Sequence, residues 1–98
     1  MAFTPKVIDS LISLTLRQCQ KGIANADPLI ERNYGLLGEK AMNLDCGSFV
    51  LKKELEIPAR LKEEVFIELL SLRQYLKIND PVLLKYFDEK ITETLNSL

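Results

Sequence analysis

The residue types that most often carry out chemistry are scarce in this chain. Histidine is absent from all 98 residues, which removes the usual general base and the Ser-His and Cys-His nucleophile pairs. Three glutamates, Glu63, Glu64 and Glu68, share part of one expected helix, and paired carboxylates can act as general acid and base where burial raises a pKa. Because they lie at the edge of the apolar stripe of that helix or opposite it, we expect them to form a solvated face.

The two cysteines, Cys19 and Cys46, are too few for a disulfide framework. Cys19 falls on the apolar side of an expected helix, so we predict a buried, reduced thiol. Cys46 lies in a glycine-containing turn, and with no histidine to act as base we expect no catalytic role for it. The glycines form no phosphate-binding pattern, and two cysteines do not make a zinc site. The sequence therefore predicts a protein that is not an enzyme and holds no cofactor and no metal.

The composition is typical of one globular domain, which we assign to residues 1–98. Apolar residues make up 47% of the chain and charged residues 28%. The 13 basic and 14 acidic residues give a formal net charge of −1, so nucleic acid is an unlikely partner on charge alone. No export signal is recognisable, since Lys6 and Asp9 interrupt the first apolar run, and no stretch is long enough to span a membrane. We expect a cytoplasmic protein with no membrane contact.

The stretch 58–77 is the clearest helix in the chain, and the rest of the predicted fold is arranged around it. At about 100° per residue, its apolar side chains gather on one broad side, which should face the core. This apolar stripe consists of Leu61, Val65, Leu69, Leu72 and Leu76, widened by Phe66 and Leu70.

Capping residues placed before prolines predict the other long helices. Thr4-Pro5 predicts a helix over 5–21, and Asp80-Pro81 predicts the last helix. Asp27-Pro28 carries the same signal, and apolar residues follow at helical spacing as far as residue 44, although Gly35 and Gly38 weaken that helix.

A turn over 45–48 precedes a short helix over 49–56, for which an extended conformation is the alternative. The predicted fold class is all-α, a small bundle of about five helices. The prolines also lie 23 residues apart in each half of the chain, at positions 5 and 28 and at 58 and 81. This spacing suggests two related helical hairpins, unless the likeness only reflects the common pattern of capped amphipathic helices.

Residues 38–61 resemble the helix-turn-helix of phage-repressor-like regulators, with an alanine, Ala41, in the first helix, a glycine turn and a short second helix. The resemblance implies a small DNA-binding regulator that would read DNA through Lys52 and Lys53. This is the alternative to the function that we favour.

More apolar surface is present than five short helices can hide from one another. We therefore predict a protein-interaction module that acts as an adaptor, a secretion-chaperone-like protein, or an inhibitor or regulator. It would bind a partner protein or a second copy of itself through apolar helix faces. The candidate partner-binding residues are Met42, Phe49, Val50, Ile67 and Ile78.

Overall fold

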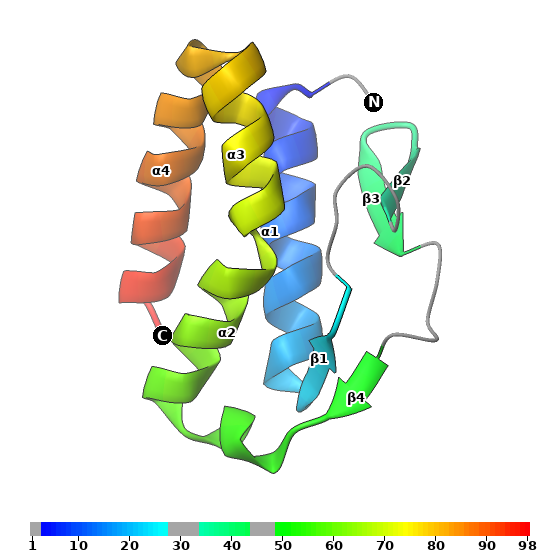
Figure 1. Ribbon diagram of the computed structural model, residues 1–98, viewed down its shortest axis with the longest axis vertical. Coiled ribbons are helices and arrows are strands. Elements are labelled where there is room, and N and C mark those ends of the chain that lie inside the picture. The colour runs from blue at the N-terminus through cyan, green and yellow to red at the C-terminus, as the bar shows by residue number, and fades with distance from the viewer. Residues whose placement is uncertain (1–2, 28–33, 44–48) are drawn as a thin grey trace.

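The fold combines helices with short strands (Figure 1). The computed structural model describes residues 3–27, 34–43 and 49–98. Within these residues, four α-helices, one 3-10 helix and four strands follow in the order α1, β1, β2, β3, β4, η1, α2, α3 and α4. The strands form two separate antiparallel pairs, β1 with β4 and β2 with β3. The prediction of an all-α bundle of five helices is therefore wrong.

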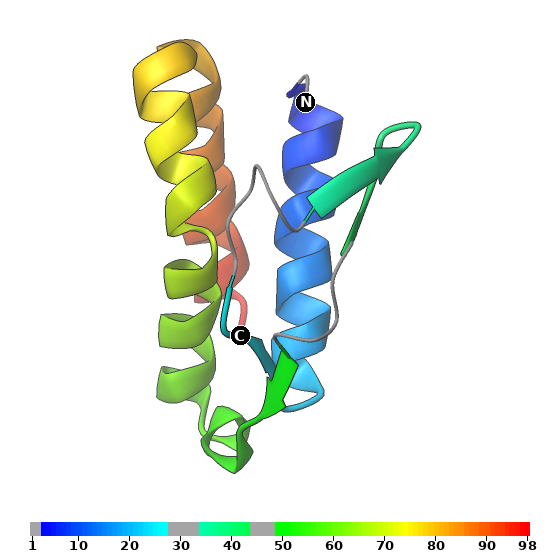
Figure 2. The ribbon, with the colours of Figure 1, turned by 45° about the vertical axis from the view of Figure 1, so that its right-hand side comes forward.

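Helix α1, Pro5–Gln20, begins where the sequence predicts. The Thr4 hydroxyl accepts a hydrogen bond from the Val7 amide at 3.2 Å, and Pro5 occupies the first turn, where a missing amide hydrogen costs nothing. The helix packs against α2, α4, β1, β3 and η1. Figure 2 shows it standing between the α2–α3 column and the β2–β3 hairpin. These neighbours on several sides bury a broad set of α1 residues: Val7, Ile8, Leu11, Ile12, Thr15 and Cys19.

Strands β2, Tyr34–Leu37, and β3, Lys40–Asn43, form a hairpin where the sequence predicted helix. The strands are joined by the two-residue loop Gly38-Glu39, in which Gly38 has a φ of +64°. A glycine with positive φ at the first loop position matches the twist of paired strands, whereas in a helix it is only a weak point. The predicted helix is therefore wrong over 34–43. Its start at Pro28 and its end at residue 44 fall outside the described residues.

Strands β1, Ile23–Asn25, and β4, Phe49–Leu51, form the second pair. Gly22, with a φ of +79°, turns the chain out of α1, and its carbonyl accepts a hydrogen bond from the Lys52 amide at 2.8 Å. The 3-10 helix η1, Lys53–Glu56, follows β4 directly. The predicted helix over 49–56 is thus wrong at its start, where the extended alternative holds. The turn predicted over 45–48, with Cys46, lies outside the described residues.

The predicted helix 58–77 is interrupted once. It consists of α2, Pro58–Glu68, and α3, Leu70–Asn79, with Leu69 between them in a non-helical conformation. The predicted stripe is buried at Val65, Leu69, Leu72 and Leu76 and half-buried at Leu61. Phe66 and Leu70, which were expected to widen it, are exposed at 39% and 38%. The buried face is narrower than predicted, and part of the apolar surface of this helix faces outward.

Helix α4, Pro81–Asn96, runs back along α3. Arg73 on α3 donates two hydrogen bonds to the Asp88 carboxylate on α4, at 3.0 and 3.2 Å, which supports the pairing of these helices. Among the described residues of the first half of the chain, α1 is followed by strands, so the α3–α4 hairpin has no helical counterpart there. The prediction of two related helical hairpins is therefore wrong.

The core lies around α1, between α1 and the helices α2 to α4 and beneath the strands. Its buried apolar residues are Val7, Ile8, Leu11, Ile12, Cys19, Ala24, Tyr34, Ala41, Leu55, Val65, Leu69, Leu72, Leu76, Phe87 and Ile91.

The start of α4 gives a direct test of the capping argument. The Asp80 carboxylate accepts a hydrogen bond from the Leu83 amide at 3.2 Å, as the sequence predicts. We expect Asp80→Ala to lower the free energy of unfolding by about 1 kcal/mol in urea melts, because that amide loses its acceptor. Asp80→Asn keeps an acceptor oxygen and should retain most of the stability. Equal losses in both variants would show that the charge matters and that the cap does not.

Candidate functional site

The five candidate partner-binding residues do not form one surface. Met42 lies on β3 and Val50 on β4, exposed at 44% and 43%, and Phe49 beside Val50 is half-buried. Ile67 on α2 and Ile78 at the end of α3 are exposed at 47% and 78%. The β2–β3 hairpin and the α2–α3 column stand on opposite sides of α1 (Figure 2). The structure thus divides the predicted residues between a strand side and a helix side.

The helix side carries a compact apolar surface, which we call the outer patch: Phe66, Ile67 and Leu70. The three side chains are exposed at 39%, 47% and 38%. Leu70, at the start of α3, lies three positions after Ile67 and four after Phe66 of α2, the spacings that bring side chains together along a helical column. Of these three residues, only Ile67 was predicted to be exposed. The helical periodicity of residues 58–77 places Phe66 and Leu70 at the edge of the apolar stripe, so the sequence assigned them to the core.

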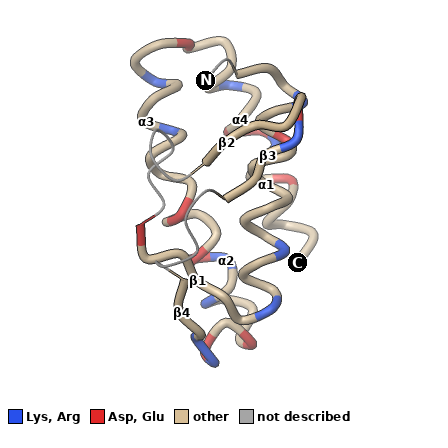
Figure 3. The backbone as a smooth tube through the Cα atoms, turned by 90° about the vertical axis from the view of Figure 1, so that its right-hand side faces the viewer, with Lys and Arg blue, Asp and Glu red and all other residues tan. Residues whose placement is uncertain are grey.

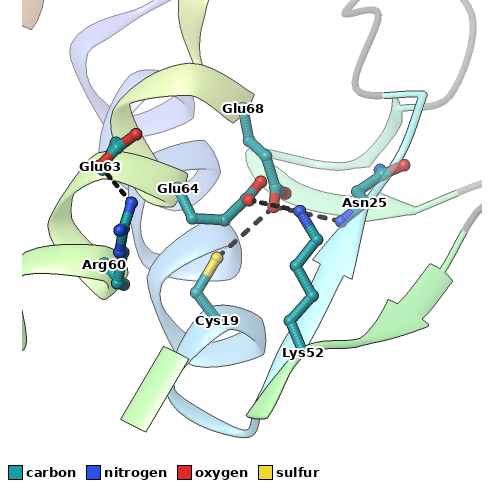
Figure 4. A network of polar contacts seen from close by, with 7 residues as sticks. All are labelled: Cys19, Asn25, Lys52, Arg60, Glu63, Glu64 and Glu68. Carbon is teal, nitrogen blue, oxygen red and sulfur yellow. Dashed lines mark hydrogen bonds and ion pairs between the residues drawn. The ribbon is translucent and has the colours of Figure 1, made fainter. Parts of the chain in front are cut away.

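The inner side of the same helix carries a buried carboxyl group. Glu68, the last residue of α2, is 2% exposed. Its Oε2 accepts hydrogen bonds from the Asn25 amide of β1 at 3.1 Å and from the Cys19 thiol of α1 at 3.6 Å (Figure 4). Thr15 and Asn25 are also buried here, and Tyr34 lies close by. The solvated face expected for Glu68 is wrong, because side chains and backbone from α1 and β1 enclose it.

Glu64 and Lys52 form an ion pair between the buried Glu68 and the protein surface. The Lys52 ammonium lies 3.1 Å from Oε1 of Glu64, whose side chain is 14% exposed. Figure 4 shows the carboxyl groups of Glu64 and Glu68 together beside Lys52. Glu63 is different, because its carboxylate meets Arg60 at 3.6 Å and both side chains are 59% exposed. Of the three glutamates, Glu63 alone matches the solvated face that the sequence predicts.

Burial raises the pKa of Glu68 to about 8, and the side chain of Glu64 beside it adds to the shift. The Asn25 amide opposes it by stabilising the carboxylate. Oε1 of Glu68 is buried and has no hydrogen-bond partner among the described residues. The raised pKa favours the neutral acid form of Glu68 near pH 7, while the Lys52 ammonium pairs with the Glu64 carboxylate.

The thiol of Cys19 and the hydroxyl of Tyr34, which lie beside Glu68, are poor nucleophiles. Burial raises the pKa of the Cys19 thiol, so the thiolate is scarce at neutral pH. Burial likewise raises the pKa of Tyr34 to about 12, and the polar side chains of Asn25 and Thr15 only partly oppose this shift. The thiol of Cys19 is free and buried, as the sequence predicts. The buried cluster of Glu68, Cys19 and Tyr34 can therefore hold a proton in the interior, but none of these three side chains is an activated nucleophile.

The surface offers weak support for DNA binding. The resemblance to a helix-turn-helix requires helices on both sides of the turn, yet residues 40–43 and 49–51 are strands. Lys52 and Lys53 line a depression of about 310 Å³, but the Lys52 ammonium is already paired with Glu64. Figure 3 shows basic and acidic residues interspersed along the chain. Neither the local fold nor the charge distribution reproduces a DNA-reading surface.

Two features were not found among the described residues. No group of three or more histidine, cysteine, aspartate or glutamate side chains in 3–27, 34–43 and 49–98 is arranged to hold a metal ion. None of the helices in that part of the chain is both long enough and apolar enough to cross a membrane.

The proton on Glu68 should appear in the pH dependence of stability. The folded protein keeps this proton up to a pKa of about 8, whereas the unfolded chain releases it near the ordinary value of 4.5. Between these pKa values the folded state binds more protons at this group, so the stability that Glu68 contributes is greatest at the low end of this range and falls as the pH rises. We expect the free energy of unfolding to fall by on the order of 1 kcal/mol per pH unit between pH 5 and 8.

Glu68→Gln should remove this slope, because glutamine has the shape of the neutral acid but does not titrate. Glu63→Gln, on the exposed side of the same helix, is the matched control and should leave the slope unchanged. Parallel stability curves for the parent and Glu68→Gln, measured by urea melts across this pH range, would contradict a buried neutral acid.

Comparison with known proteins adds no relative: no family model, no curated protein and no solved structure matches this chain.

Proposed function

We propose that this chain is a small cytoplasmic protein-interaction module that binds a protein through the outer patch of α2 and α3. The observation that carries the proposal is the exposure, at 38–47%, of three adjacent large apolar side chains on one helix face. Isolated exposed apolar residues are common on proteins, but contiguous ones usually mark interaction surfaces. Adaptor, secretion-chaperone-like and inhibitor or regulator roles all use a surface of this kind.

The rigidity of the helix beneath the patch supports the proposal. The opposite face of α2 and α3 is fixed in the core by Val65, Leu69 and Leu72, which are at most 3% exposed. A patch held on a packed helix loses little conformational freedom on binding, so more of the gain from burying apolar surface remains as affinity. Apolar anchors at these helical spacings are also typical of a helix that enters a partner's groove.

The other predicted partner-binding residues differ in their position relative to the outer patch. Ile78 lies on the same column as the outer patch, two turns beyond Leu70, and would contact a partner that follows the helix. Met42, Phe49 and Val50 belong to the strand side. They would join the same interface only if a partner reached around the molecule. The cytoplasmic location is supported by the free thiol of Cys19, since reduced cysteines are the rule there.

Substitution within the outer patch tests the function. We expect the tagged parent protein to capture a stoichiometric protein from a lysate of its source cells, and the double variant Phe66→Ser/Ile67→Ser to lose it. The reason is that the double variant removes two of the three apolar anchors. Val82→Ser is the matched control, because Val82 is 81% exposed and lies at the start of α4, outside the patch.

Mass spectrometry of the eluates would compare the three baits, after urea melts confirm that all are folded. Capture of the same protein in equal amounts by the parent and the double variant would contradict binding through the outer patch.

A further inference from the structure

The residues around the outer patch are arranged symmetrically about Leu70. Phe66 and Gln74 lie four residues before and after it, and Glu63 and Lys77 lie seven residues before and after it. All five side chains are exposed. Steps of three and four residues keep positions on one side of a helix, so these residues form a single line along α2 and α3. The line reads acidic, apolar, apolar, polar, basic.

We infer that the outer patch binds the same patch of a second copy of this chain, with the two α2–α3 columns antiparallel and a twofold axis at Leu70. The inference rests on the proposed function, and it names the partner. In an antiparallel pair, residues equally far before and after the axis meet one another. Leu70 then meets the partner's Leu70, and Phe66 packs on the aliphatic part of the partner's Gln74.

Charge complementarity favours a second copy over an unrelated protein. Glu63 faces the partner's Lys77, and Lys77 faces the partner's Glu63, so the rim of the interface carries two opposite-charge pairs related by symmetry. A parallel pair would instead place like charges together. Glu63 already meets Arg60 at 3.6 Å within its own helix, but both side chains are 59% exposed and free to adjust.

The interface is small, which predicts the kind of dimer. Three apolar side chains per chain place it at the low end of specific interfaces, where association is weak and reversible. The inferred dimer therefore forms and dissociates with protein concentration, and the outer patch becomes available to other proteins on dilution.

Charge exchange between two variants tests this arrangement. The measurement is sedimentation equilibrium of the full chain from micromolar to millimolar concentration, at low ionic strength, where exposed charges are least screened. We expect the parent to show a monomer–dimer equilibrium. Glu63→Lys and Lys77→Glu should each weaken the dimer by about tenfold, because each replaces two attractive pairs by two like-charge pairs.

An equimolar mixture of the two single variants should recover the parent's affinity. In that heterodimer the new lysine of one chain faces the new glutamate of the other, and the natural Glu63 and Lys77 also face each other. The double variant Glu63→Lys/Lys77→Glu should recover it as a homodimer. Because the substituted residues are exposed, circular dichroism should show an unchanged fold in every variant.

Three results would overturn the inference: a parent that stays monomeric at millimolar concentration, single variants that dimerise as tightly as the parent, or a mixture that fails to recover the affinity. A monomeric parent that still captures a foreign protein through Phe66 and Ile67 would overturn self-association and leave the proposed function standing. If neither self-association nor capture depends on these two residues, both proposals fail.

Discussion

The buried carboxyl of Glu68 is the contact through which three elements of the fold meet. It joins the end of α2 to the thiol of Cys19 on α1 and to the backbone amide of Asn25 on β1. A buried polar group tolerates few arrangements, because each lost hydrogen bond leaves an uncompensated atom in the interior. The register of β1 along α1 and the position of the helix break after Glu68 are therefore fixed together. The raised pKa of Glu68 is expected to lower stability as the pH rises, and we infer that the hydrogen bonds of its carboxyl favour one arrangement of the strands and helices.

The same helix explains why a small protein has both a polar interior group and an exposed apolar surface. Helix α2–α3 is apolar on more than one side, which is typical of a helix covered from several directions. Its inner side is covered by α1, α4 and η1. Nothing among the described residues covers Phe66, Ile67 and Leu70 to the same degree. The proposed interface would cover this outer side, and this links the narrow core stripe to the proposed function.

Sequence patterns predicted the parts of the fold whose signals are local. The starts of α1 and α4 follow from Thr4-Pro5 and Asp80-Pro81, because a capping side chain and a proline act within one turn. The β2–β3 hairpin was missed because its apolar residues also fit a helical period. The deciding feature is Gly38 at the first position of a two-residue loop, followed by packing of β3 on α1. That packing joins residues far apart in the chain, and short-range periodicity does not contain it.

The burial of Glu68 could not be predicted for the same reason. Its partners Cys19, on α1, and Asn25, on β1, lie 49 and 43 residues earlier in the chain. Their approach to Glu68 depends on how α1 and β1 pack against α2, which local sequence patterns do not contain. Because the group is neutral near pH 7, the core behind the outer patch adds no net charge to that face. The electrostatics of the patch are then set by its rim, where Glu63 and Lys77 are charged and exposed. In the inferred dimer, apolar contact at the centre would supply affinity and the rim charges would supply orientation, so the order of charges along α2 and α3 would favour the antiparallel pairing.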